Sequence, residues 1–384
     1  MRGRHIKSSH RFILLVSLVL FTFSQLLSAV VSPAWRHYRG SERQLGVAAG
    51  RLPEKLKPLW RFKTGGAVMS SPVVANGRVF VGSLDKHVYA LNLSNGKKIW
   101  SFKTGDSIEA PPSVIGNAVV IGSADGFLYA LDAATGKLRW KYQTEDKILG
   151  AANWATAPNG QGTWIVVGSY DNRVHCVHAD TGKRIWTYET GNYINGTPAI
   201  SDGKVIFGGC DGIIHVVKLT DGEKVNTIEV GDFIAASVAL DGRFAFIGHY
   251  GNEFLCADIA TGKIMWTYRD RAFPFFSSPA VTADRIVVGS RDKRVHCIRR
   301  QDGKPLWTFR TRGKVDSSPV VCDNKVVVGS EDGRVYLLRL SDGKELWSYQ
   351  IGEPVMSSPA VVDGKIIIGA DDGYVYAFGA AAKG

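Results

Sequence analysis

The chain has 384 residues, of which 45% are hydrophobic and 21% charged, and its formal net charge is +12. This composition excludes a disordered polyelectrolyte, and only one segment is apolar enough to cross a membrane. The five cysteines form no Cys-x-x-Cys pair, which excludes a fully paired disulfide framework and the familiar zinc-binding motifs.

The first 34 residues have the pattern of an export signal. Four of the first 11 residues are Lys or Arg, residues 12–31 carry no charge, and the small residues Ser32 and Ala34 follow. Twenty such residues also suffice to span a bilayer, and the preceding cations favour a cytoplasmic N-terminus. We expect residues 1–34 to be a cleaved signal peptide or a retained membrane anchor. Either places the rest of the chain outside the cytoplasm, in the periplasm or tethered to the membrane, with residues 35–55 as a linker.

A repeat of about 40 residues organises the chain from residue 56 to residue 379. Its first marker is a tryptophan, spaced by 40, 40, 46, 80, 41 and 40 residues, and Asn226 stands at the middle of the double gap. These tryptophans are Trp60, Trp100, Trp140, Trp186, Trp266, Trp307 and Trp347. A Gly-Ser-x-Asp-type marker follows the same period at 82–85, 122–125, 168–171, 208–211, 289–292, 329–332 and 369–372, with a degenerate copy at 248–251. Two independent markers therefore give eight units.

Each unit reads as four short antiparallel strands. In the second unit, β-branched and aromatic runs at 113–115, 118–122, 127–131 and 137–142 are separated by turns that contain Asn, Asp or Gly. No helical periodicity occurs after residue 35. Four-stranded units of this length are typical of propeller blades. The sequence therefore predicts an all-β, eight-bladed β-propeller.

The two ends of the array predict how the ring closes. The eighth unit stops after its third strand, at 374–378, and the missing fourth strand with its tryptophan is found at 59–63. We expect the N-terminal strand to complete the last blade, because closure removes the edge strands of an open array. Residues 380–384 remain as a tail.

The seven tryptophans are expected to pack between neighbouring blades and not to stack on a ligand. Burial of about 200 Å² of indole contributes on the order of 5 kcal/mol before entropy. Cys176, Cys256 and Cys297 share one strand position with alanines and are expected to be small core residues.

Candidate site residues lie where the chain crosses from an outer strand to the next inner strand, at the channel mouth. Phe276 ends an apolar run, 273–276, that is a candidate anchor for a partner, whereas Phe275 fills a core position. Glu109, Asn195 and Asp316 carry oxygen ligands that suit a hard cation, but they are spread round the ring. We therefore expect a solvated mouth without a metal. The eight mouth positions are Met69, Glu109, Leu149, Asn195, Ala235, Phe276, Asp316 and Met356.

Residues 130–140 resemble the tryptophan-docking motif of the quinoprotein repeats, A-x-D-x-x-T-G-K-x-x-W, and weaker copies end at five other tryptophans. Two families share this motif. One comprises the pyrroloquinoline-quinone (PQQ) dehydrogenases, which are enzymes, and the other comprises the BamB-type scaffolds of outer-membrane protein assembly, which are not. The resemblance implies the fold more specifically than the function.

Features of the chain favour the scaffold class. The cofactor site of the dehydrogenases resembles a sandwich between a tryptophan and a vicinal Cys-Cys disulfide, with bound Ca²⁺, and no two cysteines are adjacent here. The BamB-type resemblance fits in length but lacks a lipobox cysteine, because no cysteine precedes Cys176. We expect a monomeric, non-catalytic scaffold that binds an envelope protein and takes no cofactor or nucleic acid. The alternatives are a PQQ-dependent dehydrogenase with Ca²⁺, and a propeller that binds carbohydrate or a cell-wall polymer.

Overall fold

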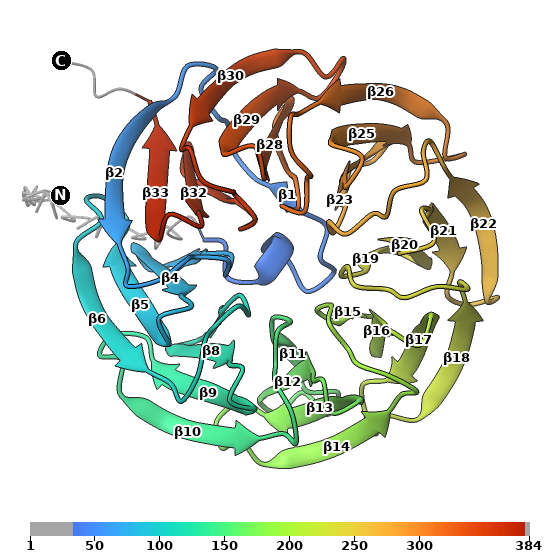
Figure 1. Ribbon diagram of the computed structural model, residues 1–384. Helices are drawn as coiled ribbons and strands as arrows, with labels where there is room; N and C mark the ends of the chain where they lie inside the picture. The colour runs from blue at the N-terminus through green and yellow to red at the C-terminus, as the bar shows by residue number, and fades with distance from the viewer. Residues whose placement is uncertain (1–33, 381–384) are drawn as a thin grey trace, which may run out of the picture. The chain divides into compact units, whose positions relative to one another are not determined.

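Residues 34–380, which the computed structural model describes, form eight sheets arranged as the blades of a ring (Figure 1). The predicted eight-bladed all-β propeller is thereby confirmed. In the second unit the strands lie within one residue of the predicted bounds. The expected export signal lies outside the described residues except for Ala34. Within the described part, no helix has the length and apolar character that a membrane crossing requires.

The blades are numbered here in chain order, and each begins with its innermost strand. Blade 1 contains β3 (Val73–Ala75), β4 (Arg78–Gly82), β5 (His87–Asn92) and β6 (Lys98–Lys103); blade 2 contains β7 (Ser113–Ile115), β8 (Ala118–Gly122), β9 (Phe127–Asp132) and β10 (Leu138–Gln143); blade 3 contains β11 (Asn153–Thr156), β12 (Thr163–Gly168), β13 (Arg173–His178) and β14 (Arg184–Glu189); blade 4 contains β15 (Ala199–Ser201), β16 (Lys204–Gly208), β17 (Ile213–Lys218) and β18 (Lys224–Glu229).

The second half of the ring repeats this order. Blade 5 contains β19 (Ala239–Asp241), β20 (Phe244–Gly248), β21 (Phe254–Asp258) and β22 (Lys263–Tyr268); blade 6 contains β23 (Ala280–Val281), β24 (Arg285–Ser290), β25 (Arg294–Arg299) and β26 (Pro305–Arg310); blade 7 contains β27 (Val320–Cys322), β28 (Lys325–Ser330), β29 (Arg334–Arg339) and β30 (Glu345–Gln350); blade 8 contains β31 (Ala360–Val362), β32 (Lys365–Gly369), β33 (Tyr374–Gly379) and β2 (Lys57–Lys63).

The ring closes as predicted. Strand β2, from the N-terminal side, pairs antiparallel with β33, and Trp60 lies opposite Ala377 in this ladder. Near the channel, the Ser358 amide donates to Ser71 Oγ (2.9 Å), which joins blade 8 to blade 1. Blade 8 thus has four strands like the other blades, with β2 outermost, and it is joined to blade 1 near the channel.

Among the described residues, six of the seven blade tryptophans donate to a carbonyl of the next blade in the ring, as Trp140 illustrates. Its indole N–H donates to the carbonyl of Ala179 (2.8 Å), and its ring covers Gly182. A Cβ at position 182 would come within 2.6 Å of that ring, and its φ is +66°, so the Thr-Gly turn requires glycine. Equivalent glycines lie under five other blade tryptophans, at 96, 136, 222, 303 and 343, so this glycine recurs with the same period as the tryptophan.

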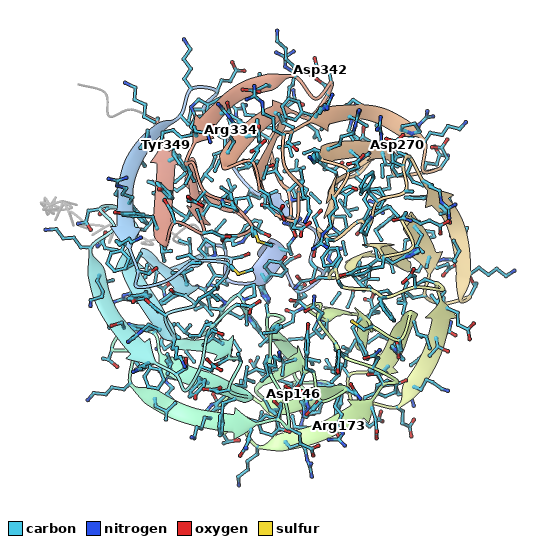
Figure 2. The ribbon with its side chains drawn as sticks, in the orientation of Figure 1. Asp146, Arg173, Asp270, Arg334, Asp342 and Tyr349 are labelled. Atoms are coloured by element: carbon cyan, nitrogen blue, oxygen red, sulfur yellow. The ribbon has the colours of Figure 1, made fainter. Side chains whose placement is uncertain are left out.

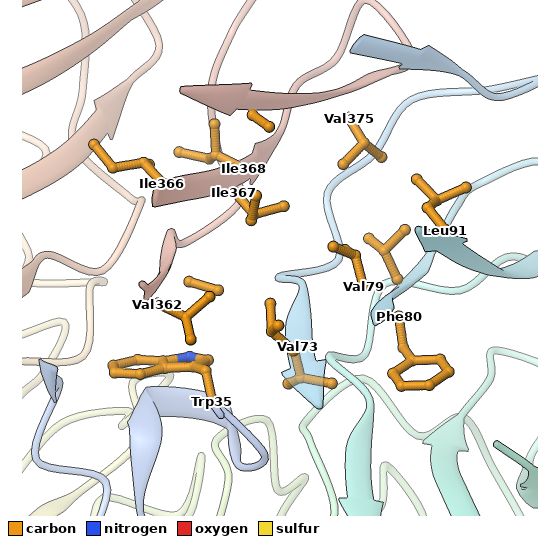
Figure 3. Packing of buried hydrophobic residues seen from close by; sticks show 14 of the residues in the cluster. Trp35, Val73, Val79, Phe80, Leu91, Val362, Ile366, Ile367, Ile368 and Val375 are labelled. Atoms are coloured by element: carbon orange, nitrogen blue, oxygen red, sulfur yellow. The ribbon is translucent and has the colours of Figure 1, made fainter. Parts of the chain in front are cut away.

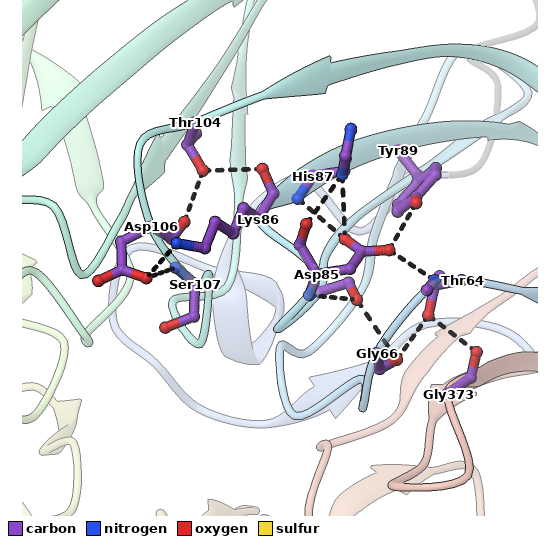
Figure 4. A network of polar contacts seen from close by, with 12 residues as sticks. Thr64, Gly66, Asp85, Lys86, His87, Tyr89, Thr104, Asp106, Ser107 and Gly373 are labelled. Atoms are coloured by element: carbon purple, nitrogen blue, oxygen red, sulfur yellow. Dashed lines mark hydrogen bonds and ion pairs between the residues drawn. The ribbon is translucent and has the colours of Figure 1, made fainter.

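A second polar network links blades at the loops of the mouth face (Figure 4). In blade 1, Asp85 accepts hydrogen bonds from the hydroxyl of Tyr89 (2.6 Å) and from the amide of Gly65 in the preceding loop (2.6 Å). Thr64 caps the same loop by donating to the carbonyls of Gly66 and Gly373. Blades 3, 4 and 6 have the same aspartate with a histidine in place of the tyrosine: His175, His215 and His296.

Residues 35–48, here called the inner segment, run round the channel. Figure 1 places η1 (Tyr38–Gly40) at the centre of the ring, followed by β1 (Val47–Ala48), which pairs in parallel with β27. In chain order the segment bonds to the innermost strands of blades 1 to 7. The pairs, given as inner-segment residue and blade residue, are Trp35 with Val74, Arg36 with Val114, Glu42 with Asn153 and with Ile200, Arg43 with Leu240, Leu45 with Val281, and Gly46 with Val321.

Two side chains anchor the inner segment. Trp35 is buried against the innermost strands of blades 1 and 8, beside Val73 and Val362 (Figure 3). Arg39, which is 1% exposed, donates to the carbonyls of Ser318 (3.0 Å), Pro279 (3.0 Å) and Pro319. Burial lowers the pKa of Arg39 to about 10, so the side chain stays charged at neutral pH. The part of the chain expected to be a linker therefore packs against the centre of the ring.

Candidate functional site

The eight mouth positions predicted from the sequence surround one cavity of about 270 Å³. Each comes from the loop that leads into the innermost strand of its blade. The inner segment contributes Tyr38, whose hydroxyl lies 3.2 Å from Ser318 Oγ in the cavity wall. Eight positions that are far apart in sequence thus surround one central cavity, and Tyr38 of the inner segment also lines it.

Two of the three mouth residues that could offer oxygen ligands to a cation already make hydrogen bonds within the protein. Both carboxylate oxygens of Asp316 accept hydrogen bonds from Arg291 (2.8–3.2 Å). Asn195 accepts a hydrogen bond from the Tyr170 hydroxyl (3.0 Å) and donates to the carbonyl of Ala235 (3.0 Å).

Glu109, the third donor, makes no hydrogen bond or ion pair with any residue in the described range 34–380 and faces the cavity. Since Asn195 and Asp316 already have partners, Glu109 is the one predicted cation ligand at the described mouth whose oxygens remain available. A single available carboxylate is a poor match to the six to eight oxygens that Ca²⁺ takes.

Phe275 and Phe276 lie as the sequence pattern suggests. Phe275 is buried and packs against Gly248 in the same way as Ile108 packs against Gly82 of blade 1. Phe276 lines the cavity, with the Arg291 guanidinium 3.5 Å above its ring and Tyr250 at 4.5 Å in an edge-on contact.

An arc of exposed aromatic side chains continues from Phe276 along one half of the mouth, over blades 4 to 6. Four of its members are between 39% and 51% exposed. These four are Tyr193, Phe233, Tyr250 and Phe273. Tyr193 also stacks on Tyr170 at 4.9 Å, which extends the arc to blade 3. We call these residues, with Phe276, the aromatic arc.

The sequence reasoning missed most of the aromatic arc, although a signal for it exists. Phe233 and Ser107 occupy the same loop position, since each accepts a hydrogen bond (2.9 Å) from the residue after the Gly-Ser or Gly-His pair of the next hairpin. A comparison of this position across the units would have found Tyr193 and Phe233, the two aromatic residues that occupy it. Tyr38 gave no signal, because it lies outside the repeats.

A larger cavity, of about 920 Å³, opens between blades 5 and 6. It is lined by Leu45 of the inner segment and by Phe244 and Trp266 of blade 5. It includes none of the eight mouth positions, and therefore does not belong to the candidate site.

An eight-bladed ring with tryptophan-docking repeats defines the chain as a PQQ-like β-propeller. More specifically, the model of the family described as outer membrane protein assembly factor BamB matches residues 53–148, 210–313 and 272–382. The chain belongs to this family. A second model, described as the lambda-carrageenase β-propeller domain, matches residues 116–205. Comparison with curated protein sequences gives no match.

Solved structures share the fold at low sequence identity. BamB from Moraxella catarrhalis is 20% identical, with a TM-score of 0.71 over 85% of this chain and 100% of its own. The quinohemoprotein alcohol dehydrogenase ADHIIG from Pseudomonas putida HK5 is 14% identical, with a TM-score of 0.76 over 90% and 80%. The computationally designed protein Ika8 is 18% identical, with a TM-score of 0.74 over 84% and 100%. A scaffold, an enzyme and a designed protein thus share this fold, which by itself assigns no function.

Proposed function

We propose that the protein is an exported, non-catalytic scaffold of the cell envelope that binds a segment of another envelope protein at its channel mouth, in the manner of the BamB-type scaffolds. The observation that carries the proposal is the aromatic arc. Exposed aromatic side chains that gather on loops of a rigid frame are typical of protein-binding surfaces. Residues 1–34 support export, as does the periplasmic setting of BamB-type proteins.

The two halves of the mouth differ in a way that suits an apolar partner segment. Blades 4 to 6 present Tyr193, Phe233 and Tyr250, whereas blade 2 has Ser107 at the position of Phe233. A partner segment would bury its apolar side chains on the arc, with Arg291 and Glu109 at the cavity wall as polar contacts. Aromatic anchors of this kind commonly dominate the binding energy of an interface.

Photo-crosslinking in native envelopes tests the proposal. A photoreactive amino acid at position 233 or 193 is expected to capture one envelope protein, and the same residue at position 107 serves as the matched control on the opposite half. Phe233→Ser should lower capture from position 193 about tenfold, since loss of an interface anchor costs about 1.4 kcal/mol or more. Equal capture from positions 233 and 107, insensitive to Phe233→Ser, would contradict the proposal.

The alternative, a PQQ-dependent dehydrogenase, has the support of the fold likeness to quinohemoprotein alcohol dehydrogenase. Addition of PQQ and Ca²⁺ with an artificial electron acceptor separates the two functions. Reproducible dye reduction that depends on an alcohol or a sugar would replace the scaffold by the dehydrogenase.

A third candidate, carbohydrate binding, is favoured by the match of residues 116–205 to the lambda-carrageenase propeller model. Aromatic side chains also offer flat apolar faces to sugar rings. Retention of the protein on cell-wall polymer that is lost in Phe233→Ser would assign the arc to carbohydrate.

A further inference from the structure

The loop between blades 5 and 6 departs from the repeat at Asp270, two residues after the end of β22. In blades 1 to 4 and 7 the corresponding residue is a threonine, such as Thr144 or Thr190, whose hydroxyl caps the loop by donating to two carbonyls. The loop that leads into blade 6 is also one residue longer, because four residues lie between Asp270 and the core position Phe275, whereas three lie between Thr144 and Ile148.

The change of loop leaves a buried carboxylate oxygen without a partner. In blades 3 and 4 the second oxygen of the hairpin aspartate accepts a loop amide, Glu145 N to Asp171 (3.1 Å) and Gly191 N to Asp211 (3.2 Å). No loop amide donates to the equivalent Asp292 in blade 6. Its Oδ2 has no hydrogen-bond partner among residues 34–380, and its side chain is 2% exposed. A buried ionised oxygen without a partner is costly and calls for an explanation.

Asp270 and Asp292 converge on His296, a residue of β25 that is fully buried. Asp292 Oδ1 lies 3.2 Å from His296 Nε2, and Asp270 Oδ2 lies 3.9 Å from Nδ1. One ligand atom of each of the three residues lies within 4.8 Å of the other two. Figure 2 places Asp270 over blade 6, away from the centre of the ring.

The nearby arginine side chains are not hydrogen-bonded to the carboxylate oxygens of Asp270 and Asp292. The two carboxylates face two arginine side chains: Arg294 Nε lies 3.9 Å from Asp292 Oδ2, and Arg271 Nε lies 4.0 Å from Asp270. Both distances exceed a hydrogen bond. The carboxylates therefore keep oxygens that are free to bind an ion.

The position of the histidine ring is fixed by a neighbouring residue. The Tyr268 hydroxyl lies 3.0 Å from His296 Nδ1, which orients the imidazole and directs Nε2 towards Asp292. The same Tyr–His–Asp arrangement fixes His175 and His215 in blades 3 and 4, so the feature that distinguishes His296 is Asp270, 3.9 Å from its Nδ1.

We propose that Asp270, Asp292 and His296 form a binding site for a divalent transition-metal ion. One imidazole nitrogen and two carboxylate oxygens, with water completing the coordination, suit Zn²⁺ or Mn²⁺. Asp270 is the ligand that closes on the ion, because it is exposed while the other two are held by the blade. The ion would fix the longer loop, which carries Phe273 and Phe276, to blade 6. The proposal does not depend on the scaffold function.

Isothermal titration of the purified protein with Zn²⁺, and with Mn²⁺ in a second arm, tests the site. We expect one ion per chain and an upward shift of the melting temperature with ion concentration. Asp270→Thr restores the residue of the other blades and should still fold. It is expected to weaken the affinity by more than the roughly 10- to 100-fold that loss of an outer-shell partner costs.

Thr190→Ala is the matched control, because blade 4 has the same Asp–His pair with a threonine in place of Asp270; the ion affinity should not change. Asp292→Asn gives a second variant with a lost ligand and should also weaken binding. Ion binding of equal affinity in Asp270→Thr and the unmodified protein would overturn the proposal and assign the ion to another site, such as a cysteine. Absence of one-to-one binding by both ions would overturn it as well.

Discussion

The contact between blades 4 and 5 differs in composition from the contact between blades 2 and 3. At blades 2 and 3, His175 joins the Tyr142 hydroxyl (2.9 Å) to Asp171 (3.0 Å), and Trp140 packs over Gly182. All of these polar groups are buried or half-buried. They are satisfied by one another, so the contact has both a tryptophan wedge and a closed polar network.

Every one of these groups is replaced between blades 4 and 5. Ile228 takes the place of the tyrosine, Gly251 that of the aspartate, and Leu255 that of the histidine, and Ile228 and Leu255 are buried in one apolar cluster. Asn226 replaces the tryptophan but keeps its hydrogen bond, because its side-chain amide donates to the carbonyl of Ile259 (3.2 Å).

The difference teaches that the network is retained or lost as a unit. Removal of one member leaves a buried charge or donor unpaired, whereas removal of all members leaves a packed apolar contact. The degenerate marker at 248–251 therefore reflects the joint replacement of the tyrosine, the aspartate and the histidine of the network. In addition, His249 stands where blades 1 to 3 have serine, and its Nδ1 accepts the Gly251 amide (3.1 Å) as Ser169 Oγ accepts that of Asp171 (3.2 Å).

The largest expected effect concerns the tryptophan wedge. Trp140→Ala should lower the free energy of unfolding by about 3–5 kcal/mol, since it removes a large ring from between two blades. Asn226→Ala, the matched change at blades 4 and 5, should cost about 1 kcal/mol, the value of one hydrogen bond. Denaturant unfolding followed by circular dichroism measures both. A loss below about 1 kcal/mol for Trp140→Ala would refute the wedge assignment.

A smaller effect is expected from the polar network. His175→Leu should cost about 3 kcal/mol, because it leaves Asp171 buried with a lost partner. The triple variant Tyr142→Ile, Asp171→Gly, His175→Leu copies the contact of blades 4 and 5 and should be more stable than the single variant by about 1 kcal/mol or more. Thermal and denaturant unfolding of the two variants gives the comparison. A triple variant less stable than His175→Leu would show that the groups contribute independently.

The repeats made the fold predictable from the sequence, because the same local pattern occurs eight times and errors at one copy are corrected by the others. The closure by β2 followed from simple counting of strands, which Trp60 made possible. The mouth positions were also predictable, since they occupy one place in each repeat. Their convergence round one cavity was not, because the sequence does not show that the inner segment narrows the channel.

The features that remained hidden lie outside the repeat pattern. Arg39 belongs to the inner segment, which has no repeat, and its hydrogen-bond partners among residues 34–380 are backbone carbonyl groups, which leave no trace in sequence. The proposed site at Asp270 was not predicted from the sequence for another reason. His175, His215 and His296 occupy one strand position in three blades, and each lies against an aspartate of its own blade. The loop that leads into blade 6 is one residue longer than the loops that lead into blades 3 and 4. The sequence does not show that this loop brings Asp270 close to His296.

The smallest expected effect is a dependence of stability on pH through His249 in blade 5. The side chain is buried, and burial lowers its pKa below the ordinary value of about 6.5. Glu253, at 3.5 Å from Nε2, and Asp232 oppose this shift but do not reverse it. The unfolded chain therefore binds a proton near pH 6.5 that the folded chain does not bind until a lower pH.

Stability should accordingly be constant above pH 6.5 and fall as the pH decreases towards 5, with a slope of at most about 1.4 kcal/mol per pH unit from this residue. His249→Ser, which installs the residue of blades 1 to 3, should reduce the slope. Some slope should persist, because burial also lowers the pKa of His37 in the inner segment. Unfolding free energies at pH 5.0, 5.5, 6.0 and 7.0 for the protein and the variant decide the matter. Equal slopes would mean that the pKa of His249 is the same in the folded and the unfolded chain, so that its contact with Glu253 offsets its burial.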